Sequence, residues 1–368
     1  MSRLLPHVTV RLRTLTTLIQ AGGIPRPNFL HHKLVRSFCT SSATMSKPKV
    51  LVTRLDIPQK ALDMMNEKFE MDIWHQTHPI PRDELLKRIN GKDALFCLLT
   101  EKIDKEVLEA AGPNLKVIGT MSVGHDHLSL EEIKKRGIKV GYTPGVLTDA
   151  TAELTVALLL ATTRRLFEAN KELLNGGWSK CAWSPLWMTG LGLAGSTVGI
   201  FGLGRIGQGV VRRLQGFGVK QFIYSGHSPK KEGEELGVKY VSHDEILRES
   251  DFLIVTCALN DETRGIFDED AFAKMKKSAI IVNTSRGGVI NQDALIKALK
   301  TNQIRAAGLD VMTPEPLLPD HELITLPNCT LIPHIGSAEV RTRELMATLT
   351  ATNIICGLEG NPMAASLC

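Results

Sequence analysis

Short apolar runs rich in β-branched residues alternate along the chain with stretches in which apolar residues recur every three or four positions. The first pattern predicts strands buried on both faces of a parallel sheet, and the second predicts amphipathic helices. In the N-terminal half, the pattern predicts a helix at 60–69 and strands at 49–53, 94–99, 116–120 and 138–141. These elements are expected to form one compact α/β unit.

The alternation resumes after a predicted long helix at 149–169 and an irregular, tryptophan-rich segment at 178–191. Six further strands are predicted near 197–202, 221–225, 252–256, 279–283, 306–309 and 330–332. Six parallel strands match a doubly wound dinucleotide-binding sheet. A last helix at 339–358 is expected to return the chain to the first unit, which makes that unit discontinuous in sequence.

The strand predicted at 197–202 leads directly into the glycine pattern G-x-G-x-x-G and then into a helical pattern. Gly202 permits the tight turn, Gly204 lets backbone N–H groups approach a pyrophosphate, and Gly207 lets the helix lie close to the sheet. Such a match alone is weak, because many glycine-rich turns bind nothing. Its position between strand and helix nevertheless favours a dinucleotide site.

Polar motifs follow three of the later predicted strands. They contain Arg286, then Asp310 and Glu315, and then His334. Open α/β sheets bind ligands at the carboxyl ends of their strands, so these side chains are expected to converge on one site. Taken singly, each could be a loop histidine, a solvated carboxylate or a surface cation.

Composition limits the possible partners. The chain has 368 residues, of which 43% are hydrophobic and 5% aromatic, enough for two ordinary domains. Its formal charge of +5 includes five arginines and one lysine within residues 1–45, where no acidic residue occurs. Removing those six charges leaves about −1 for the remainder, and this near-neutral balance without a basic stripe argues against a nucleic-acid partner.

Residues 1–45 have the composition of a cleavable transit peptide, which predicts import into mitochondria. A start at Met45 would instead give a cytosolic form.

No apolar run approaches the roughly 20 residues of a membrane span, so no membrane partner is expected. The seven cysteines are scattered and include no C-x-x-C pair, so neither a metal site nor a disulfide framework is predicted.

From Lys49 onward the chain resembles the D-isomer-specific 2-hydroxyacid dehydrogenase family. Within it, Met121-Ser-Val-Gly124, Gly176-Gly-Trp178 and Pro185-Leu-Trp187 are similar to members that reduce glyoxylate and hydroxypyruvate. The resemblance implies an α/β fold of two doubly wound domains, with a Rossmann dinucleotide-binding domain inserted in a flavodoxin-like substrate domain. We expect a substrate domain at 46–147 plus 339–368, a dinucleotide-binding domain at 148–338, and a homodimer.

The family implies a catalytic Arg, Glu and His at Arg286, Glu315 and His334. Reduction of a 2-keto acid needs a proton donor near neutral pH, which suits His334, and a neighbouring Glu315 would hold the ring and favour its charged form. Arg286 would pair with the substrate carboxylate through its planar fork. The resemblance places further substrate contacts at Val123, Gly124, Ser337 and Leu99, and at Trp183, which could reach a neighbouring subunit or simply form a dimer contact.

The cofactor is expected to be NADPH, with NADH as a weaker alternative. An acidic residue after the second strand would favour NAD, but this chain has Ser225, His227, Ser228 and Lys230 there. These hydroxyls and cations suit a 2′-phosphate, although the resemblance leads us to expect Arg at position 227. Further cofactor contacts are implied at Gly202, Gly204, Arg205, Ile206, Gly207, Ala258, Thr284, Asp310 and Gly336.

Two alternatives remain open at this point. One is a different D-2-hydroxyacid dehydrogenase, such as an enzyme acting on phosphoglycerate. The other is a dinucleotide-sensing binding protein like the transcriptional corepressors built on this fold, because fold alone does not fix function. The absence of long disordered flanks and the predicted import signal argue against the second.

Overall fold

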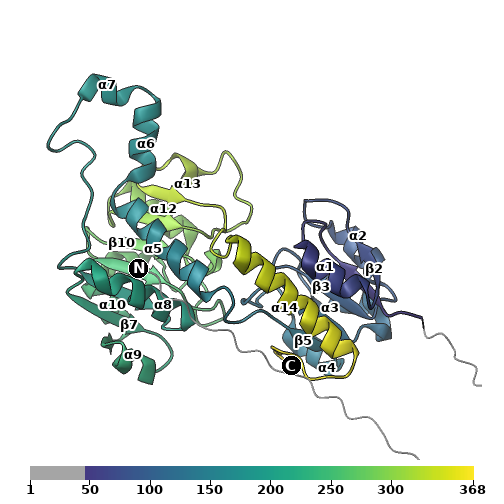
Figure 1. Ribbon diagram of the computed structural model, residues 1–368. Coiled ribbons are helices and arrows are strands. Elements are labelled where there is room, and N and C mark those ends of the chain that lie inside the picture. The colour runs from purple at the N-terminus through teal and green to yellow at the C-terminus, as the bar shows by residue number, and fades with distance from the viewer. Residues whose placement is uncertain (1–45) are drawn as a thin grey trace, which may run out of the picture. The chain divides into compact units, whose positions relative to one another are not determined.

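The computed structural model describes residues 46–368, so the predicted transit peptide lies outside the described residues. Within 46–368 the strands form two separate sheets, both entirely parallel, with helices on their faces (Figure 1). No helix in this part of the chain combines the length and apolar character needed to cross a membrane.

The first sheet has five strands in the order β2-β1-β3-β4-β5, the arrangement of flavodoxin-like folds. Their bounds are β1 Lys49–Val52, β2 Glu70–Ile73, β3 Ala94–Cys97, β4 Val117–Thr120 and β5 Lys139–Gly141. The sequence pattern did not single out β2, because this edge strand is only half-buried and carries Glu70 and Asp72 among its four residues. The central β3 and β4 are buried throughout, as their apolar runs indicate.

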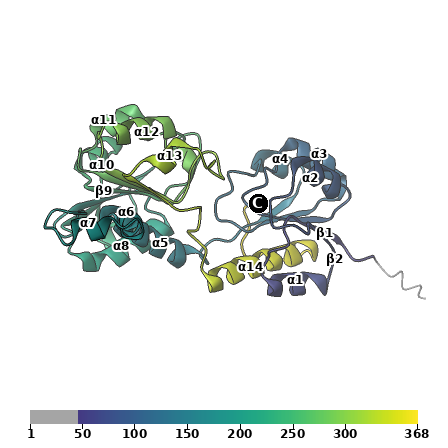
Figure 2. The ribbon, with the colours of Figure 1, turned by 90° about the horizontal axis from the view of Figure 1, so that it is seen from above.

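Helices cover both faces of this first sheet (Figure 2). One face packs on α1 (Gln59–Asn66) and on the last helix, α14 (Val340–Leu358), through a core that includes Val50, Phe96 and Ile354. The other face packs on α2 (Arg82–Ile89), α3 (Lys105–Ala111) and α4 (Leu130–Lys135). The last helix of the chain therefore completes the sheet that the first strand begins.

The second sheet has seven strands in the order β12-β11-β10-β9-β6-β7-β8. Counted from β6, this is the Rossmann order 3-2-1-4-5-6 with one strand added beyond the sixth. The strands are β6 Thr197–Phe201, β7 Gln221–Ser225, β8 Val238–Tyr240, β9 Phe252–Val255, β10 Ile280–Asn283, β11 Ala306–Leu309 and β12 Cys329–Leu331. The sequence pattern missed β8, a three-residue edge strand with two exposed positions.

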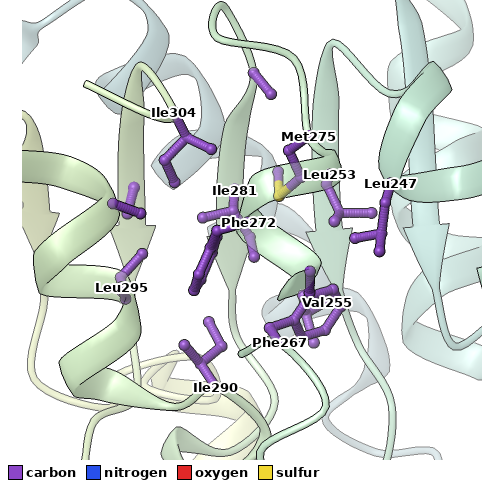
Figure 3. Close-up of a cluster of buried hydrophobic side chains, with 14 of the residues drawn as sticks. Leu247, Leu253, Val255, Phe267, Phe272, Met275, Ile281, Ile290, Leu295 and Ile304 are labelled. Carbon is purple, nitrogen blue, oxygen red and sulfur yellow. The ribbon is translucent and has the colours of Figure 1, made fainter. Parts of the chain in front are cut away.

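Two hydrophobic cores sandwich the second sheet. One lies between the strands and α5 (Thr148–Thr163) with α8 (Arg205–Leu214), and includes Leu158, Ile200 and Val210. Figure 3 shows the other, in which Phe272 lies beside Ile281 of β10 and Phe267 lies beside Val255 of β9. Its helices are α10 His243–Glu249, α11 Glu269–Lys274, α12 Gln292–Lys300 and the short α13 Glu322–Thr325. The short α9 Lys231–Glu235 instead packs on Tyr224 of the first core through Gly233. The predicted α/β fold class with two doubly wound units is confirmed.

The single helix predicted at 149–169 is wrong in one respect, because the structure has two helices there, α5 and α6 (Leu166–Leu174). Arg165 separates them with φ 55°, in the left-handed region. The carbonyl of Thr163 accepts a hydrogen bond from the N–H of Leu191 at 2.9 Å. The backbone at Gly190 also packs directly on this end of α5, where a side chain would collide, so the returning segment ends the helix.

Candidate active site

The glycine turn joins β6 to α8 as its sequence predicts. Gly202 has φ 98°, and a Cβ there would lie 2.7 Å from the backbone of Cys257. A Cβ on Gly207 would lie 2.6 Å from the carbonyl oxygen of Gly202, so this glycine allows α8 to approach the strand. A Cβ on Gly204 would meet nothing within 4 Å, which leaves open space in front of the helix N-terminus. The turn thus has the backbone and the room that a pyrophosphate cradle requires.

A cavity of about 440 Å³ lies beside this turn, and its walls come from loops that follow strands of both sheets. Thirteen of the residues predicted from the sequence line it: Leu99, Val123, Gly124, Gly204, Arg205, Ile206, Ala258, Thr284, Arg286, Asp310, His334, Gly336 and Ser337. The remaining predicted residues lie outside its lining. They are Gly202, Gly207, Ser225, His227, Ser228, Lys230, Glu315 and Trp183.

Glu315 lies behind His334 and holds its ring. The Nδ1 atom of His334 is 2.6 Å from Oε2 of Glu315, and the other carboxylate oxygen accepts from the N–H of Met312 at 2.9 Å. Burial opposes ionisation of Glu315, but the hydrogen bond and charge of His334 lower the pKa of this carboxyl below its ordinary value. With Nδ1 committed to Glu315, Nε2 is the ring nitrogen left for the cavity.

Asp310 fixes the backbone that carries the histidine. Its carboxylate accepts from the N–H groups of Ile335 at 2.6 Å and Gly336 at 2.8 Å, and its carbonyl oxygen accepts from the N–H of His334 at 2.8 Å. These bonds stabilise His334 at φ 52°, a conformation rarely adopted by residues other than glycine. Burial raises the pKa of Asp310 to about 6, although both backbone bonds favour its charged form.

Arg286 reaches the cavity from the loop after β10 and contacts a residue that no sequence motif indicated. Its Nε donates to Oδ1 of Asp126 at 2.9 Å, and its Nη1 donates to the carbonyl oxygen of Ser285 at 2.9 Å. Asp126 follows β4 of the other sheet, so this pair links the two sheets' loops across the cavity. A spacing signal could not reveal it, because the partners are 160 positions apart.

The loop that carries Val123 and Gly124 is held from behind by a buried hydrogen-bond network. The hydroxyl of Ser122 donates to the carbonyl oxygen of Gly124 at 2.8 Å and lies 2.8 Å from the hydroxyl of Thr120. Thr120 in turn lies 3.0 Å from Nε2 of His127, whose buried Nδ1 has no hydrogen-bond partner among residues 46–368. Burial lowers the pKa of His127 to about 4, so this ring is neutral at physiological pH.

The Leu99 loop is fixed in a similar way by a buried carboxylate. Glu101 accepts from the N–H of Leu98 at 2.7 Å and from the hydroxyl of Thr53 at 2.8 Å. Burial raises the pKa of Glu101 above its ordinary value. These bonds tie the ends of β1 and β3 together at the position where the strand order of this sheet reverses.

The residues predicted to hold a 2′-phosphate follow β7 on an open surface. Ser225 is buried, whereas His227, Ser228 and Lys230 are exposed. The Nδ1 atom of His227 lies 3.9 Å from a carboxylate oxygen of Glu262, and the two side chains are 88% and 76% exposed. Glu262 comes from the loop after β9. No acid directly follows β7 in the sequence, but the fold brings one there from elsewhere.

Trp183 lies in the segment after α7 (Gly177–Cys181) and is 82% exposed. It does not line the cavity of its own chain. Several large apolar side chains of this region are also exposed, namely Leu166, Phe167, Leu173, Leu174, Trp178 and Leu186. Figure 1 shows α6 and α7 extending away from the second sheet.

Comparisons with known proteins show what the chain is similar to. Residues 156–336 match the family described as D-isomer specific 2-hydroxyacid dehydrogenase, NAD binding domain. The chain is 55% identical over 299 residues to the glyoxylate reductase/hydroxypyruvate reductase of Mus musculus, covering 81% of this chain and 90% of that protein.

Solved structures show the same likeness. A Thermus thermophilus protein is 42% identical with a TM-score of 0.81, covering 87% of this chain and 100% of that one. An NADPH-dependent glyoxylate/hydroxypyruvate reductase of Sinorhizobium meliloti, solved with NADP and malonate, is 30% identical with a TM-score of 0.77. That match covers 88% of this chain and 97% of the other.

Proposed function

Because the chain belongs to the D-isomer-specific 2-hydroxyacid dehydrogenase family, we propose that it uses NADPH to reduce hydroxypyruvate to D-glycerate and glyoxylate to glycolate. Its family and relatives already show that the chain is an NAD(P)H-dependent 2-hydroxyacid dehydrogenase. The observation that supports 2-keto acid reduction at this site is the convergence of His334, Glu315 and Arg286 beside the glycine turn. The relatives' names supply the two substrates.

The residues around the glycine turn fit a dinucleotide. Gly202 and Gly207 fill positions where a Cβ would collide with backbone, while the space before Gly204 is open. Gly204, Arg205 and Ile206 would hold the pyrophosphate, and Ala258, Thr284 and Gly336 would line the nicotinamide end. A bound nicotinamide supplies the hydride that reaches the keto carbon.

His334 provides the proton that the reduction requires. Its Nε2 faces the cavity with Nδ1 bonded to Glu315, so Nε2–H donates to the keto oxygen as that oxygen gains negative charge. Glu315 keeps the ring oriented and stabilises its charged form before transfer. After transfer the imidazole is neutral, and the product hydroxyl carries the proton.

Arg286 and the Val123–Gly124 loop bind the other end of the substrate. The guanidinium pairs with the substrate carboxylate and polarises the keto group, and backbone N–H groups of the loop add hydrogen bonds to the carboxylate. Leu99 and Ser337 complete the pocket wall. A cavity of about 440 Å³ that must also take the nicotinamide leaves room for a small 2-keto acid only.

The preference for NADPH is supported by the residues after β7. His227, Ser228 and Lys230 offer cationic and hydroxyl groups to a 2′-phosphate, and β7 itself ends without an acid. Glu262 acts against this preference because its carboxylate lies close to His227. We therefore expect NADPH to be favoured by a modest factor, with measurable use of NADH.

The exposed apolar side chains of α6, α7 and the following segment support a homodimer formed through this arm, with Trp183 contributed to the neighbouring subunit's cavity. Sedimentation of a monomer at micromolar concentration would contradict the dimer.

Residues 1–45 are proposed to direct mitochondrial import, with a cytosolic form possible from Met45. A reporter carrying residues 1–45 that stays wholly cytosolic would contradict the import.

The deciding experiment follows the absorbance of NADPH and NADH at matched concentrations with hydroxypyruvate, glyoxylate, pyruvate and phosphohydroxypyruvate. Rapid NADPH oxidation with the first two substrates, lost in His334→Ala, is the expected result. Preferred turnover of phosphohydroxypyruvate would instead identify a phosphoglycerate-type enzyme. No turnover of any pair, with nicotinamide binding intact, would favour the dinucleotide-sensing alternative.

A further inference from the structure

We infer that Asp126 is a positioning residue for the reaction, which holds the guanidinium of Arg286 in the orientation that receives the substrate carboxylate. This inference rests on the proposed role of Arg286. Asp126 follows β4 and Arg286 follows β10, and both line the cavity. Their contact joins Nε of Arg286 to Oδ1 of Asp126 at 2.9 Å, and the side chains are 21% and 29% exposed respectively.

The donors of Arg286 divide into a fixed edge and a free edge. A guanidinium has five N–H groups. Nε–H binds Asp126, and one N–H of Nη1 binds the carbonyl oxygen of Ser285 at 2.9 Å. The second N–H of Nη1 and both N–H groups of Nη2 make no hydrogen bond within residues 46–368. Asp126 therefore binds Nε–H of Arg286. A carboxylate bound in bidentate fashion to Nη1 and Nη2 does not use that donor.

The free edge lies against the loop predicted to bind the same carboxylate. A Cβ on Gly124 would collide with Nη2 of Arg286, and it would lie 3.1 Å from Oδ1 of Asp126. The glycine therefore allows the guanidinium and the loop backbone to come together. A substrate carboxylate placed here meets donors from Arg286 and from the loop at once.

Asp126 is suited to this work because it stays charged beside Arg286. Burial opposes its ionisation, but the charge and hydrogen bond of Arg286 lower the pKa of the Asp126 carboxyl below its ordinary value. An arginine side chain has many rotamers, and fixing them before binding reduces the entropy that the substrate must overcome. The opposite role is a latch, in which Asp126 competes with substrate for Arg286. The single contact at Nε, which leaves Nη2 free, favours positioning.

The test compares Asp126→Ala, Asp126→Asn and Arg286→Lys in the full chain. Steady-state kinetics with hydroxypyruvate and NADPH give kcat and KM, and calorimetry measures binding of oxamate, an unreactive analogue of a 2-keto acid, to the enzyme–NADPH complex. In Asp126→Ala we expect KM and the oxamate Kd to rise roughly tenfold, with a smaller fall in kcat. Asp126→Asn keeps an oxygen acceptor for Nε–H and should recover most of the loss.

Two controls separate positioning from general damage. Asp149→Ala removes a surface pair with Arg213 of the same 2.9 Å length and should leave all values unchanged. The affinity for NADPH and the thermal midpoint should also stay unchanged in Asp126→Asn. Because Asp126 acts through Arg286, adding Asp126→Ala to Arg286→Lys should change the oxamate Kd much less than it does alone.

Three outcomes overturn the inference. Tighter oxamate binding in Asp126→Ala would identify a latch, and a full additive loss in the Arg286→Lys background would show that Asp126 acts independently. Unchanged KM and oxamate Kd in Asp126→Ala would show that Arg286 needs no partner. Failure of the proposed function has a different signature, namely no hydroxypyruvate turnover by the unaltered protein.

Discussion

The two ends of the proposed cofactor cleft are built differently. At the substrate end, the side chains of His334 and Glu315 lie 2.6 Å apart, and Asp310 binds the backbone of residues 334–336 through hydrogen bonds of 2.6 to 2.8 Å. At the phosphate end, His227 and Glu262 are almost fully exposed and lie 3.9 Å apart. Water and salt screen the second pair more strongly than His334 and Glu315, whose side chains are 25% and 29% exposed. The proposed chemistry thus rests on interlocking contacts, whereas the proposed preference between the two dinucleotides rests on weak ones.

The largest effect is expected from removing the proton donor. His334→Ala should lower kcat for hydroxypyruvate by roughly 10²- to 10⁴-fold, the usual contribution of a general acid, while the dissociation constant for NADPH stays within about twofold. Stopped-flow turnover and fluorescence titration measure the two quantities. A loss confined to NADPH binding would mean that His334 serves the cofactor and not the substrate.

Glu315→Gln should have the next largest effect. The amide keeps the shape of the side chain but removes the charge that orients and stabilises the charged His334 ring, so kcat should fall roughly 10- to 100-fold. The variant should leave KM for NADPH unchanged. A kcat equal to that of the unaltered protein would show that Asp310 and the backbone alone hold the histidine.

His127→Asn should change the response of stability to acid. The folded-state pKa of His127 is about 4, below the ordinary value of 6.5, so the unfolded chain takes up the proton first. The contribution of the neutral His127 ring to the free energy of unfolding is therefore fully present above pH 6.5. It is lost as the pH falls toward 4. At about pH 4.5 this loss amounts to about 2 to 3 kcal/mol, and the variant should escape it.

Urea unfolding at neutral pH and at about pH 4.5 measures this difference. His75→Asn, at an exposed histidine in the loop after β2, is the matched control and should behave like the unaltered protein. An equal loss of stability with and without His127 would mean that its ring is not kept neutral by the fold.

Glu262→Gln should have the smallest effect. Removing this exposed carboxylate beside His227 should raise kcat/KM for NADPH roughly two- to fivefold and leave NADH unaffected, and added salt should reduce the difference. Asp261→Asn removes a neighbouring charge that forms no ion pair within residues 46–368 and serves as the control. An equal gain for both cofactors would show that Glu262 does not oppose the 2′-phosphate.

The sequence predicted those features that depend on neighbours along the chain. The central strands, the glycine turn and the polar motifs after β10, β11 and β12 are visible as local patterns. Patterns failed where a distant segment decides the conformation. The packing of Gly190 and Leu191 on Thr163 ends α5, and the edge strand β8 owes its existence to pairing with β7.

The same distinction applies to the candidate site. The residue types of Arg286, Glu315 and His334, each placed after a predicted strand, indicate their chemistry from the sequence alone. Asp126 and Glu262 could not be found in this way, because each acts on a residue that only folding brings near. A lone aspartate or glutamate on a loop has no spacing signature.

The return of α14 to the first sheet has a consequence for synthesis on the ribosome. The face formed by Val50, Val52 and Phe96 is covered in part by Met346, Ala347 and Ile354, which leave the exit tunnel after all five strands of that sheet. The last strand of the seven-stranded sheet, β12, precedes α14 in the chain, so that sheet is complete before this face is covered. The sheet that is synthesised first is therefore completed last. During translation its uncovered apolar face is the surface that chaperones must protect.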